Sequence, residues 1–356
     1  MFNRRLQRIR NGFPQQGLDG LMVCKPENRF YLSGFSGSAG MLLITPEQAL
    51  LITDFRYEQQ AHEEAPDYQI INGGTQLTQT VLDQVTALGI ARLGFESDFI
   101  TFDQFNALSE KIKPVVLEPQ KGLIEQLRQL KDKEEIVYIR KAIEISDYAF
   151  QQVLPLIRPG VLEQDLAAEI EYLMRKKGSA RAAFDTIVAS GPRGALPHGI
   201  ASNKPVVRGE MVLMDFGAVF AGYHSDLSRT VVVGNPTKEQ QFIYELVLKA
   251  QREALIALRS GLTGAEVDRI ARSIIIDAGY CEYWGHGLGH GVGLSIHEEP
   301  RLSAVSAAVL RPGMVVTVEP GVYLPGWGGV RIEDMVVIGD EGCEILTAAT
   351  KEFIIL

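Results

Sequence analysis

Acidic residues and histidines gather in the second half of the chain in a pattern suited to binding metal ions. Asp215 and Asp226 lie in the segment MVLMDFGAVFAGYHSDLSRTVVV, and Glu319 and Glu333 lie in MVVTVEPGVYLPGWGGVRIEDMVVIG. His290 belongs to GHGLGHGVGLSIHEEP, which holds three of the six histidines. Carboxylates and an imidazole suit hard or borderline divalent cations, so Mn, Co, Fe and Zn are all chemically acceptable.

The first acidic pair is predicted to face one cavity from a β-hairpin. The flanks MVLM and TVVV are strand-like, and Ala221-Gly222 is a plausible turn. A two- or four-residue loop puts Asp226 opposite Gly217 and on the same face as Asp215, whereas a three-residue loop separates the two carboxylates. The alternative is that neither residue binds a metal: Asp215 would be a carboxylate at a strand end, and Asp226 a surface or turn residue. Burial of an unpartnered Asp215 would cost several kcal/mol, which a shared cation removes.

The second acidic pair lies in another strand-rich segment. Glu319 is predicted at the end of its first apolar run, and Glu333 inside its second. A buried ion pair between Glu333 and Arg331 is the structural alternative to a ligand role for Glu333. Strand alternation predicts that Asp334 faces the solvent.

Glycines alternate with other residues through the histidine-rich stretch, at positions 285, 287, 289, 291 and 293. We expect their missing side chains to leave backbone room for a metal and a substrate beside the imidazoles. Because Val292 and Leu294 interrupt it, the stretch is no GxGxxG dinucleotide motif. A flexible loop with solvated histidines is the alternative.

Four carboxylates would balance the charge of two divalent ions, which indicates a dinuclear centre. Such ions lie roughly 3.5 to 4 Å apart and lower the pKa of a shared water from about 15.7 toward 7. Hydrolysis is therefore the predicted class of reaction.

A repeated arrangement of elements is predicted to bring the acidic pairs together. In each half two helices lead to one strand pair, and each strand pair carries two of the four acidic residues. The helices are expected at about residues 134–156, 163–177, 238–259 and 264–278. A pseudo-twofold repeat would place acidic residues from both halves at one cavity.

Two domains are predicted, a small α/β domain over residues 1–125 and a catalytic α/β (α+β) domain over residues 126–356. The length of 356 residues exceeds what one hydrophobic core usually organises. In the first part, the short apolar runs GLDGLMVC, MLLIT, ALLIT and ARLGFE predict strands. Near Leu130 the pattern changes to helical spacing, in LKDKEEIVYIRKAIEISDYAFQQVLPLI.

Composition argues against several kinds of partner. The net charge of -9 and the pI near 5.3 disfavour nucleic acid, whose binding needs clustered Lys and Arg. The start MFNRRLQRIR has no apolar signal-peptide core and no run reaches membrane-spanning length, so we expect a cytoplasmic protein with no membrane partner. Three cysteines without a CxxC pattern predict no disulfide framework and mostly buried thiols.

Taken together, these segments resemble the aminopeptidase P and prolidase family of metallopeptidases, whose catalytic domain has the pita-bread fold. The resemblance is carried by FDTIVASGPRGALPHG, MDFGAVFAGYHSDLSRTVVVG, GHGLGHGVGLSIHEEP, TVEPGVY and GGVRIED. NRFYLSGFSGSAG and LLITDFRYEQQA are similar to the creatinase-like domain that precedes the catalytic domain in this family. The match covers essentially the whole chain.

The resemblance implies five metal ligands and two divalent ions. The ligands would be Asp215, Asp226, His290, Glu319 and Glu333. Asp226 and Glu333 would bridge both ions, for which Mn is the first candidate and Co, Zn or Fe the others.

Further roles follow from the same resemblance. His198 is similar to the family's substrate-side histidine, and His297 to the histidine that contacts the scissile carbonyl. Glu319 is the expected acceptor of the proton from the nucleophilic water. His286 and Arg331 match positions that support the ligands from behind.

The implied activity is cleavage of the bond between an N-terminal residue and proline, by a hydroxide that bridges the metals. The pattern TDxRYxxQA favours an Xaa-Pro aminopeptidase of the aminopeptidase P type. The catalytic half is equally similar to Xaa-Pro dipeptidases, or prolidases, which are the alternative. Proline-containing peptides are the expected substrates, and the resemblance also implies a homodimer.

Other hypotheses use the same residues differently. A methionine aminopeptidase would not need the N-terminal domain, and a creatine amidinohydrolase would not need five intact ligands. A non-catalytic pita-bread binding module usually lacks part of the ligand set. A Cys-His hydrolase built on Cys281 and His286 has no recognisable orienting partner.

Overall fold

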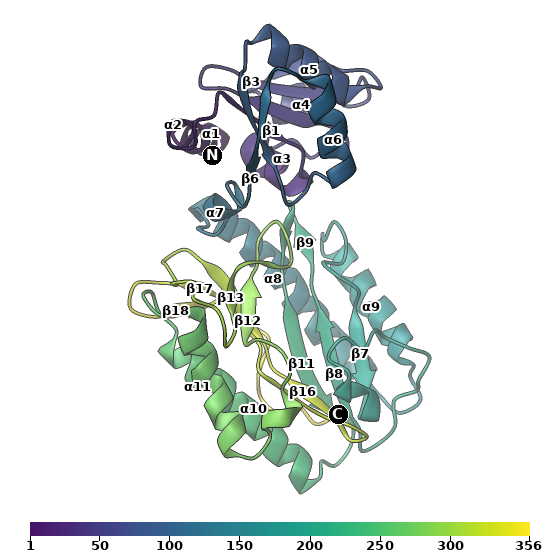
Figure 1. Cartoon of the computed structure of the whole chain (residues 1–356). Helices are drawn as coiled ribbons and strands as arrows, with labels where there is room; N and C mark the ends of the chain where they lie inside the picture. The colour runs from purple at the N-terminus through teal and green to yellow at the C-terminus, as the bar shows by residue number, and fades with distance from the viewer. The chain divides into compact units, whose positions relative to one another are not determined.

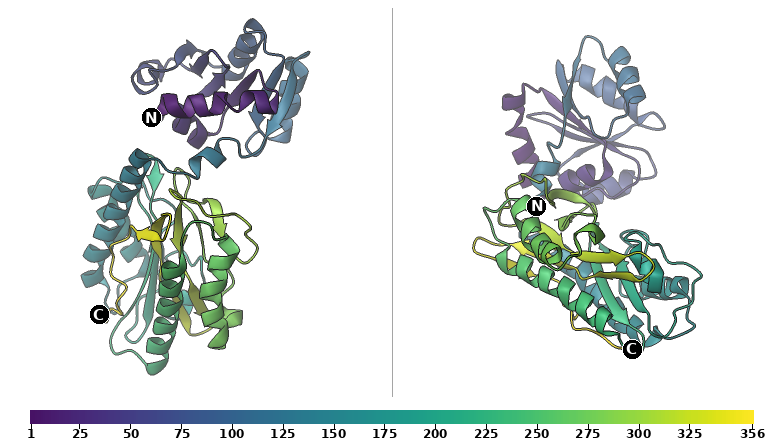
Figure 2. Two further views of the ribbon diagram at one scale, coloured as in Figure 1. Left: turned by 90° about the vertical axis from the view of Figure 1, so that its left-hand side faces the viewer. Right: turned by 60° about the horizontal axis from the view of Figure 1, so that its bottom comes forward.

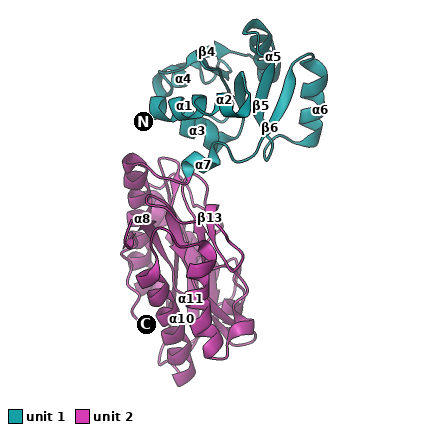
Figure 3. Ribbon diagram, turned by 60° about the vertical axis from the view of Figure 1, so that its left-hand side comes forward, with its two compact units in different colours: residues 1–128 teal, residues 129–356 magenta.

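The first part of the chain folds around a mixed sheet. The computed structural model describes residues 1–356 and divides into two compact units, residues 1–128 and 129–356 (Figure 3). In the first unit six strands follow the order β4-β3-β2-β1-β5-β6. These strands are β1 (Gly20–Val23), β2 (Met41–Ile44), β3 (Ala49–Thr53), β4 (Gln69–Asn72), β5 (Arg92–Glu96) and β6 (Val116–Gln120).

Helices surround this sheet. They are α1 (Phe2–Arg10), α2 (Phe13–Gln16), α3 (Pro26–Ser33), α4 (Glu58–Glu64), α5 (Leu77–Ala87), α6 (Phe102–Lys111) and α7 (Glu125–Arg128). Apolar residues of α5 and α6, among them Val81 and Leu108, pack on sheet residues such as Leu43 and Ile52. This alternation of helices with short apolar strands is the predicted α/β organisation.

The second unit consists of two helix pairs with strands between them. The helices are α8 (Lys133–Val153), α9 (Glu163–Lys176), α10 (Lys238–Ala257) and α11 (Gly264–Asp277), beside the short 3-10 helices η1 (Leu154–Leu156), η2 (Gly191–Ala195) and η3 (Cys281–Tyr283). These four long helices confirm the four that the sequence predicts. Figures 1 and 2 show α8 and α9 on one flank of the strands, and α10 and α11 on the other.

Each helix pair forms its own core with its own sheet. The first core joins α8 and α9 to the sheet β11-β8-β7, with strands β7 (Ile187–Ser190), β8 (Met211–Phe216) and β11 (Leu227–Val232). The second joins α10 and α11 to the sheet β13-β12-β14-β17-β18, with strands β12 (Gly289–Gly291), β13 (Glu298–Leu302), β14 (Val315–Val318), β17 (Asp334–Ile338) and β18 (Cys343–Ile345). Two small hairpins complete the unit, β9 (Val219–Phe220) with β10 (Tyr223–His224) and β15 (Gly321–Leu324) with β16 (Gly328–Arg331).

Capping explains why three of the long helices begin where they do. Asp132 accepts hydrogen bonds from the second and third backbone N–H groups of α8, and the Asp132 N–H donates in turn to the Glu135 carboxylate. Thr237 and Thr263 make the same reciprocal arrangement at α10 and α11. Each of these side chains accepts from backbone N–H groups of the first turn, which have no carbonyl partner within the helix. The α9 helix begins without any side-chain cap, at Glu163.

The two sheets meet where β11 runs beside β16 and the start of β17. The Thr230 hydroxyl donates to the carbonyl of Arg331 at 3.1 Å, and the Arg331 N–H donates back to that hydroxyl at 3.2 Å. The N–H of Glu333 donates to the Ser228 carbonyl at 3.2 Å. This seam places the second acidic pair beside the first, as the predicted repeat requires. None of the helices combines the length and the hydropathy needed to cross a membrane.

The prediction that Asp334 faces solvent is wrong. Its side chain is fully buried, and it pairs with Arg229 at 2.9 Å and Lys351 at 2.5 Å. Gln251 of α10 also donates to it at 2.8 Å. Strand alternation fails here because both faces of β17 are covered, so the face turned away from the acidic cluster is also interior.

Candidate metal centre

The first hairpin has the predicted register. Ser228 of β11 stands opposite Asp215 of β8, and the turn is the two-residue Ala221-Gly222. Both turn residues have positive φ, 49° and 83°, as a tight hairpin turn of the primed types demands. With this register confirmed, the carboxylates of Asp215 and Asp226 share one face, and with Glu333 they offer oxygens that all lie within 4.8 Å of one another.

Glu319 and Glu333 flank the paired ends of two neighbouring strands. In the ladder of β14 with β17, Val318 is paired with Asp334. Glu319 directly follows β14 and Glu333 directly precedes β17. Both residues therefore lie at the same end of this strand pair, next to the acidic cluster. Glu333 was expected inside a strand, but it lies in the short break between β16 and β17. That break lets its buried side chain turn toward Ser228 and the other carboxylates.

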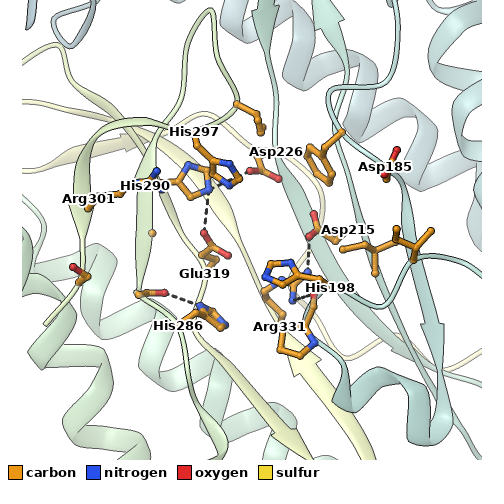
Figure 4. A pocket seen from close by; sticks show the side chains of 18 residues that line it. Asp185, His198, Asp215, Asp226, His286, His290, His297, Arg301, Glu319 and Arg331 are labelled. Carbon is orange, nitrogen blue, oxygen red and sulfur yellow. Dashed lines mark hydrogen bonds and ion pairs between the residues drawn. The ribbon is translucent and has the colours of Figure 1, made fainter. Parts of the chain in front are cut away.

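His290 reaches the cluster from β12. Its Nε2 atom lies 3.3 Å from Glu319 Oε1 and 3.6 Å from Asp226 Oδ2 (Figure 4). Nδ1 lies 3.1 Å from the carbonyl of Gly291, so a proton on Nδ1 leaves the Nε2 lone pair free for a metal ion. The Thr317 hydroxyl accepts from the His290 N–H and donates to Glu319, each at 3.0 Å.

Two glycines of this stretch, Gly289 and Gly291, are needed for close strand packing. A side chain at Gly289 would meet the Thr317 carbonyl at 2.0 Å, and one at Gly291 would meet the Glu299 carbonyl at 2.4 Å. The predicted space is therefore filled by neighbouring backbone at these two positions. Glycine permits that approach because it has no Cβ atom.

The electrostatics of the cluster favour a cation. Burial and then mutual repulsion raise the pKa of Asp226 and Glu333 well above the usual carboxyl range, and burial raises that of Asp215. Asp215 Oδ1 and Glu333 Oε1 are buried oxygens without a hydrogen-bond donor. A buried oxygen of this kind is costly unless a cation or a donor satisfies it. The four carboxylates and His290 therefore fit the divalent ions that the family implies.

Arg331 and Ser228 organise the cluster from behind. Arg331 donates to Asp215 Oδ2 at 2.5 Å, to the Ser228 hydroxyl at 2.7 Å and to the Tyr323 hydroxyl at 2.8 Å. Ser228 in turn donates to Glu333 Oε2 at 2.7 Å. The sequence did not single out Ser228, Tyr323 or Thr317, although Ser228 stands only two residues after Asp226. The structure therefore has no direct ion pair between Glu333 and Arg331, which was the structural alternative; the Ser228 hydroxyl connects the two side chains.

The three remaining predicted histidines line a pocket of about 500 Å³ over the cluster (Figure 4). The His297 ring lies 4.4 Å from that of His290. Burial, with further contributions from His290 and Arg301, lowers the pKa of His297 to about 4, so its imidazole is neutral at pH 7. His286 lies 2.9 Å from the Tyr323 hydroxyl, and His198 is exposed at the rim.

Two acidic neighbours of the predicted ligands pair with cations of their own. Glu298 pairs with Lys131, and Asp334 with Arg229.

Of the cysteines, Cys281 is exposed and the other two are partly buried, so the expectation of mostly buried thiols is wrong. Cys281 belongs to η3 and does not line the pocket.

The lining of the pocket includes apolar side chains and the cation of Arg301. Phe184, Ile187, Pro197, Ile200 and Ile296 line it together with Arg301. Arg301 stands opposite His290 in the pairing of β12 with β13. Unlike Arg331, the Arg301 guanidinium has no carboxylate partner in the protein.

Comparison with known proteins places this arrangement in a family. Residues 137–340 match the model of "Metallopeptidase family M24", and residues 5–130 match the "Creatinase/Prolidase N-terminal domain". These matches confirm the expected pita-bread catalytic domain behind a creatinase-like domain.

Relatives match over their whole length. The Xaa-Pro dipeptidase of Pyrococcus horikoshii is 41% identical, with 99% of each chain covered. Among solved structures, an Xaa-Pro dipeptidase from Bacillus anthracis is 45% identical with a TM-score of 0.97, and 100% of each chain is covered. An X-Pro aminopeptidase from Thermotoga maritima is 39% identical with a TM-score of 0.92, and 99% of each chain is covered. The chain therefore belongs to metallopeptidase family M24 and carries a creatinase/prolidase N-terminal domain ahead of its peptidase domain.

Proposed function

We propose that this protein is an Xaa-Pro dipeptidase, a prolidase, and that Arg301 selects its substrate. The observation that carries the proposal is the unpaired Arg301 guanidinium in the wall of the pocket that holds the acidic cluster. The names of the relatives support the dipeptidase alternative better than the aminopeptidase P activity that the sequence first suggested.

We assign the metal ligands to Asp215, Asp226, His290, Glu319 and Glu333, and we propose that they hold two Mn²⁺ ions. Asp226 and Glu333 would hold the ions through buried carboxylates that lie beside that of Asp215. When bound, the ions supply a Lewis acid and a water of lowered pKa. Burial acts to raise the pKa of Glu319, but the interactions with His290, His286 and Arg331 together outweigh it and lower the pKa to about 2. Glu319 is therefore charged at neutral pH and available as a ligand.

The histidines and the apolar wall would orient the substrate. His297, neutral and next to His290, is placed to donate to the carbonyl oxygen of the scissile bond as negative charge develops on it. His198 would contact the substrate from the rim of the pocket. Phe184, Ile187 and Ile200 offer an apolar surface to the proline ring, which has no N–H to satisfy. His286 and Arg331 hold Tyr323 and Asp215 in place behind these groups.

Arg301 gives a physical reason for preferring dipeptides. In an Xaa-Pro dipeptide the proline ends in a free carboxylate, which can pair with an unoccupied guanidinium. A longer peptide carries an uncharged amide at that point. A hydrogen bond to a charged group contributes about 1.5 to 3 kcal/mol, so the free carboxylate is worth roughly 10- to 100-fold in kcat/KM.

The test compares Ala-Pro, Ala-Pro-amide and Ala-Pro-Ala on the Mn²⁺-loaded protein. We expect Ala-Pro to have the highest kcat/KM, and Arg301→Gln to lower it roughly 10- to 100-fold for Ala-Pro but little for Ala-Pro-amide. Arg301→Lys keeps the charge and is the matched control, expected to lose less. Faster cleavage of Ala-Pro-Ala than of Ala-Pro would instead support an aminopeptidase. Absence of cleavage of all three would refute the proposed function.

The homodimer stays a prediction from the resemblance, and the cytoplasmic location stays a prediction from the sequence. We expect a molecular mass of twice 39.2 kDa in light scattering at micromolar concentration. A fully active monomer would contradict the dimer.

A further inference from the structure

Residues 191–201 form a loop that carries His198 to the rim of the pocket. The His198 side chain is exposed, and no protein hydrogen bond or ion pair holds its imidazole. Its neighbours Leu196 and Ile200 are 52% and 55% exposed, so the tip of the loop has little packing of its own. The place of His198 over the pocket therefore depends on where the loop is fastened.

Both ends of this loop are fastened to one carboxylate, that of Glu163. Its Oε1 accepts from the Ser190 N–H at 2.7 Å and the Ser190 hydroxyl at 2.8 Å. Its Oε2 accepts from the Ser202 N–H at 3.2 Å and the Ser202 hydroxyl at 2.6 Å. Arg193, inside the loop, also donates to Oε2, and its other nitrogen donates to the Ile200 carbonyl at 2.8 Å. One side chain thus ties together the start, the interior and the end of the loop.

Glu163 is placed for this task by the start of α9. It is the first residue of that helix and is fully buried. The backbone N–H groups of Glu163 and Gln164 donate to the carbonyls of Lys204 and Ser202, at 3.0 and 2.9 Å. The uncapped end of the helix is therefore joined to residues 202–204, which follow the loop, and the Glu163 carboxylate is left to bind the loop itself. A buried carboxylate is tolerated only when donors surround it, and here five do.

Other contacts also hold the loop. Arg331 donates to the Pro197 carbonyl at 3.3 Å, and Gly194 packs so closely on β16 that a side chain there would meet the Gly329 nitrogen at 2.9 Å. Nearer the ends, Ser190 is paired with Val212 in the ladder of β7 with β8, and Ile200 forms a β-bridge with Ile187. The Gln164 N–H donates to the Ser202 carbonyl. The Glu163 carboxylate contacts Ser190, Arg193 and Ser202 together, so its loss would loosen the segment between Ser190 and Ser202 that carries His198.

We propose that Glu163 is a positioning residue for hydrolysis, because it fixes the loop that presents His198 to the substrate. This inference rests on the proposed function, since it gives His198 a contact with the substrate. Glu163 lines no part of the pocket, so it acts on the reaction only through the loop.

The test combines Glu163→Gln with His198→Ala in a double-mutant cycle on the Mn²⁺-loaded protein. The glutamine keeps the size of the side chain but loses the charge and presents N–H donors to Arg193 or a serine. We expect Glu163→Gln to lower kcat for Ala-Pro roughly 10- to 100-fold, with bound Mn²⁺ unchanged. In the His198→Ala background the same change should lower kcat no further, because the imidazole that the loop positions is already gone. Glu171→Gln, on the exposed face of α9, is the matched control and should retain wild-type kcat.

A second measurement does not depend on activity. Hydrogen exchange of the amides of residues 191–201 should be faster in Glu163→Gln than in the wild type or in Glu171→Gln, while exchange in β8 and β11 stays unchanged. Ser202→Ala removes a single hydroxyl donor and should shift kcat and exchange in the same direction by less. If Glu163→Gln does not fold, Ser202→Ala replaces it in the double-mutant cycle with His198→Ala.

Each outcome decides one claim. Losses of kcat that multiply in the double variant, or unchanged exchange in the loop, would overturn the positioning role of Glu163. If His198→Ala alone kept wild-type kcat, the proposed role of His198 would fail, and with it the route by which Glu163 affects hydrolysis. Faster exchange in Glu163→Gln would then show only that the carboxylate fastens the loop.

Discussion

Excess EDTA is expected to abolish hydrolysis of Ala-Pro by this protein, and Mn²⁺ or Co²⁺ to restore it. The proposed mechanism gives no side chain the role of nucleophile, so activity depends on a water whose pKa a metal ion lowers. Cys281, the exposed cysteine, lies outside the pocket, and Cys281→Ala should retain wild-type kcat. Hydrolysis that persists in excess EDTA would contradict the metal mechanism.

The same prediction has a readout in stability. Binding of Mn²⁺ to the folded protein alone should raise Tm in proportion to the logarithm of the free ion concentration. Asp226→Asn removes one of the buried oxygens of the cluster and should lose both the rise in Tm and the activity. Asp277→Asn makes the same chemical change at an exposed position at the end of α11 and is the matched control. An equal rise in Tm in both variants would remove Asp226 from the ligand set.

Replacing His297 with alanine is expected to lower kcat by roughly 10² to 10³, or about 2.7 to 4 kcal/mol, the effect of losing one donor to a developing oxyanion. Its ring lies beside His290, yet the four carboxylates and His290 already supply five ligands, so bound metal should stay the same. KM should change much less than kcat, because the donor strengthens mainly in the transition state. Steady-state kinetics and elemental analysis of the same sample measure both.

A matched control for His297→Ala is available in the first unit. His62 is an exposed histidine at the end of α4, and His62→Ala should leave kcat unchanged. Loss of one metal ion from His297→Ala would make His297 a ligand instead. Wild-type kcat in that variant would make the residue structural.

Patterns that depend on local geometry were predictable from the sequence. The turn at Ala221-Gly222 fixes the register of β8 with β11, because a two-residue loop leaves one pairing only. The four long helices of the second unit follow from apolar spacing, and capping residues such as Asp132 and Thr263 sharpen their starts. In the first unit the sequence missed β4 and β6, since these edge strands are half exposed and lack a strong apolar run.

Features that depend on tertiary packing were not predictable from a single sequence. Asp334 looked exposed by alternation, but Arg229 and Lys351, both remote in the chain, bury and neutralise it. Ser228 and Tyr323 gained their roles only when the seam between the two sheets brought Arg331 to them. The close strand contacts at Gly289 and Gly291 were likewise invisible, because the carbonyls that fill the space come from β14 and from the Glu299 backbone.

The central claim is that five side chains of this chain hold two divalent ions beneath the substrate pocket. A crystal structure of the Mn²⁺-loaded protein, with anomalous data collected above the Mn absorption edge, tests it most directly. The account predicts two anomalous peaks, roughly 3.5 to 4 Å apart, with oxygens of Asp226 and Glu333 between them and His290 Nε2 on one of them. A single peak, or peaks that contact other side chains, would contradict it.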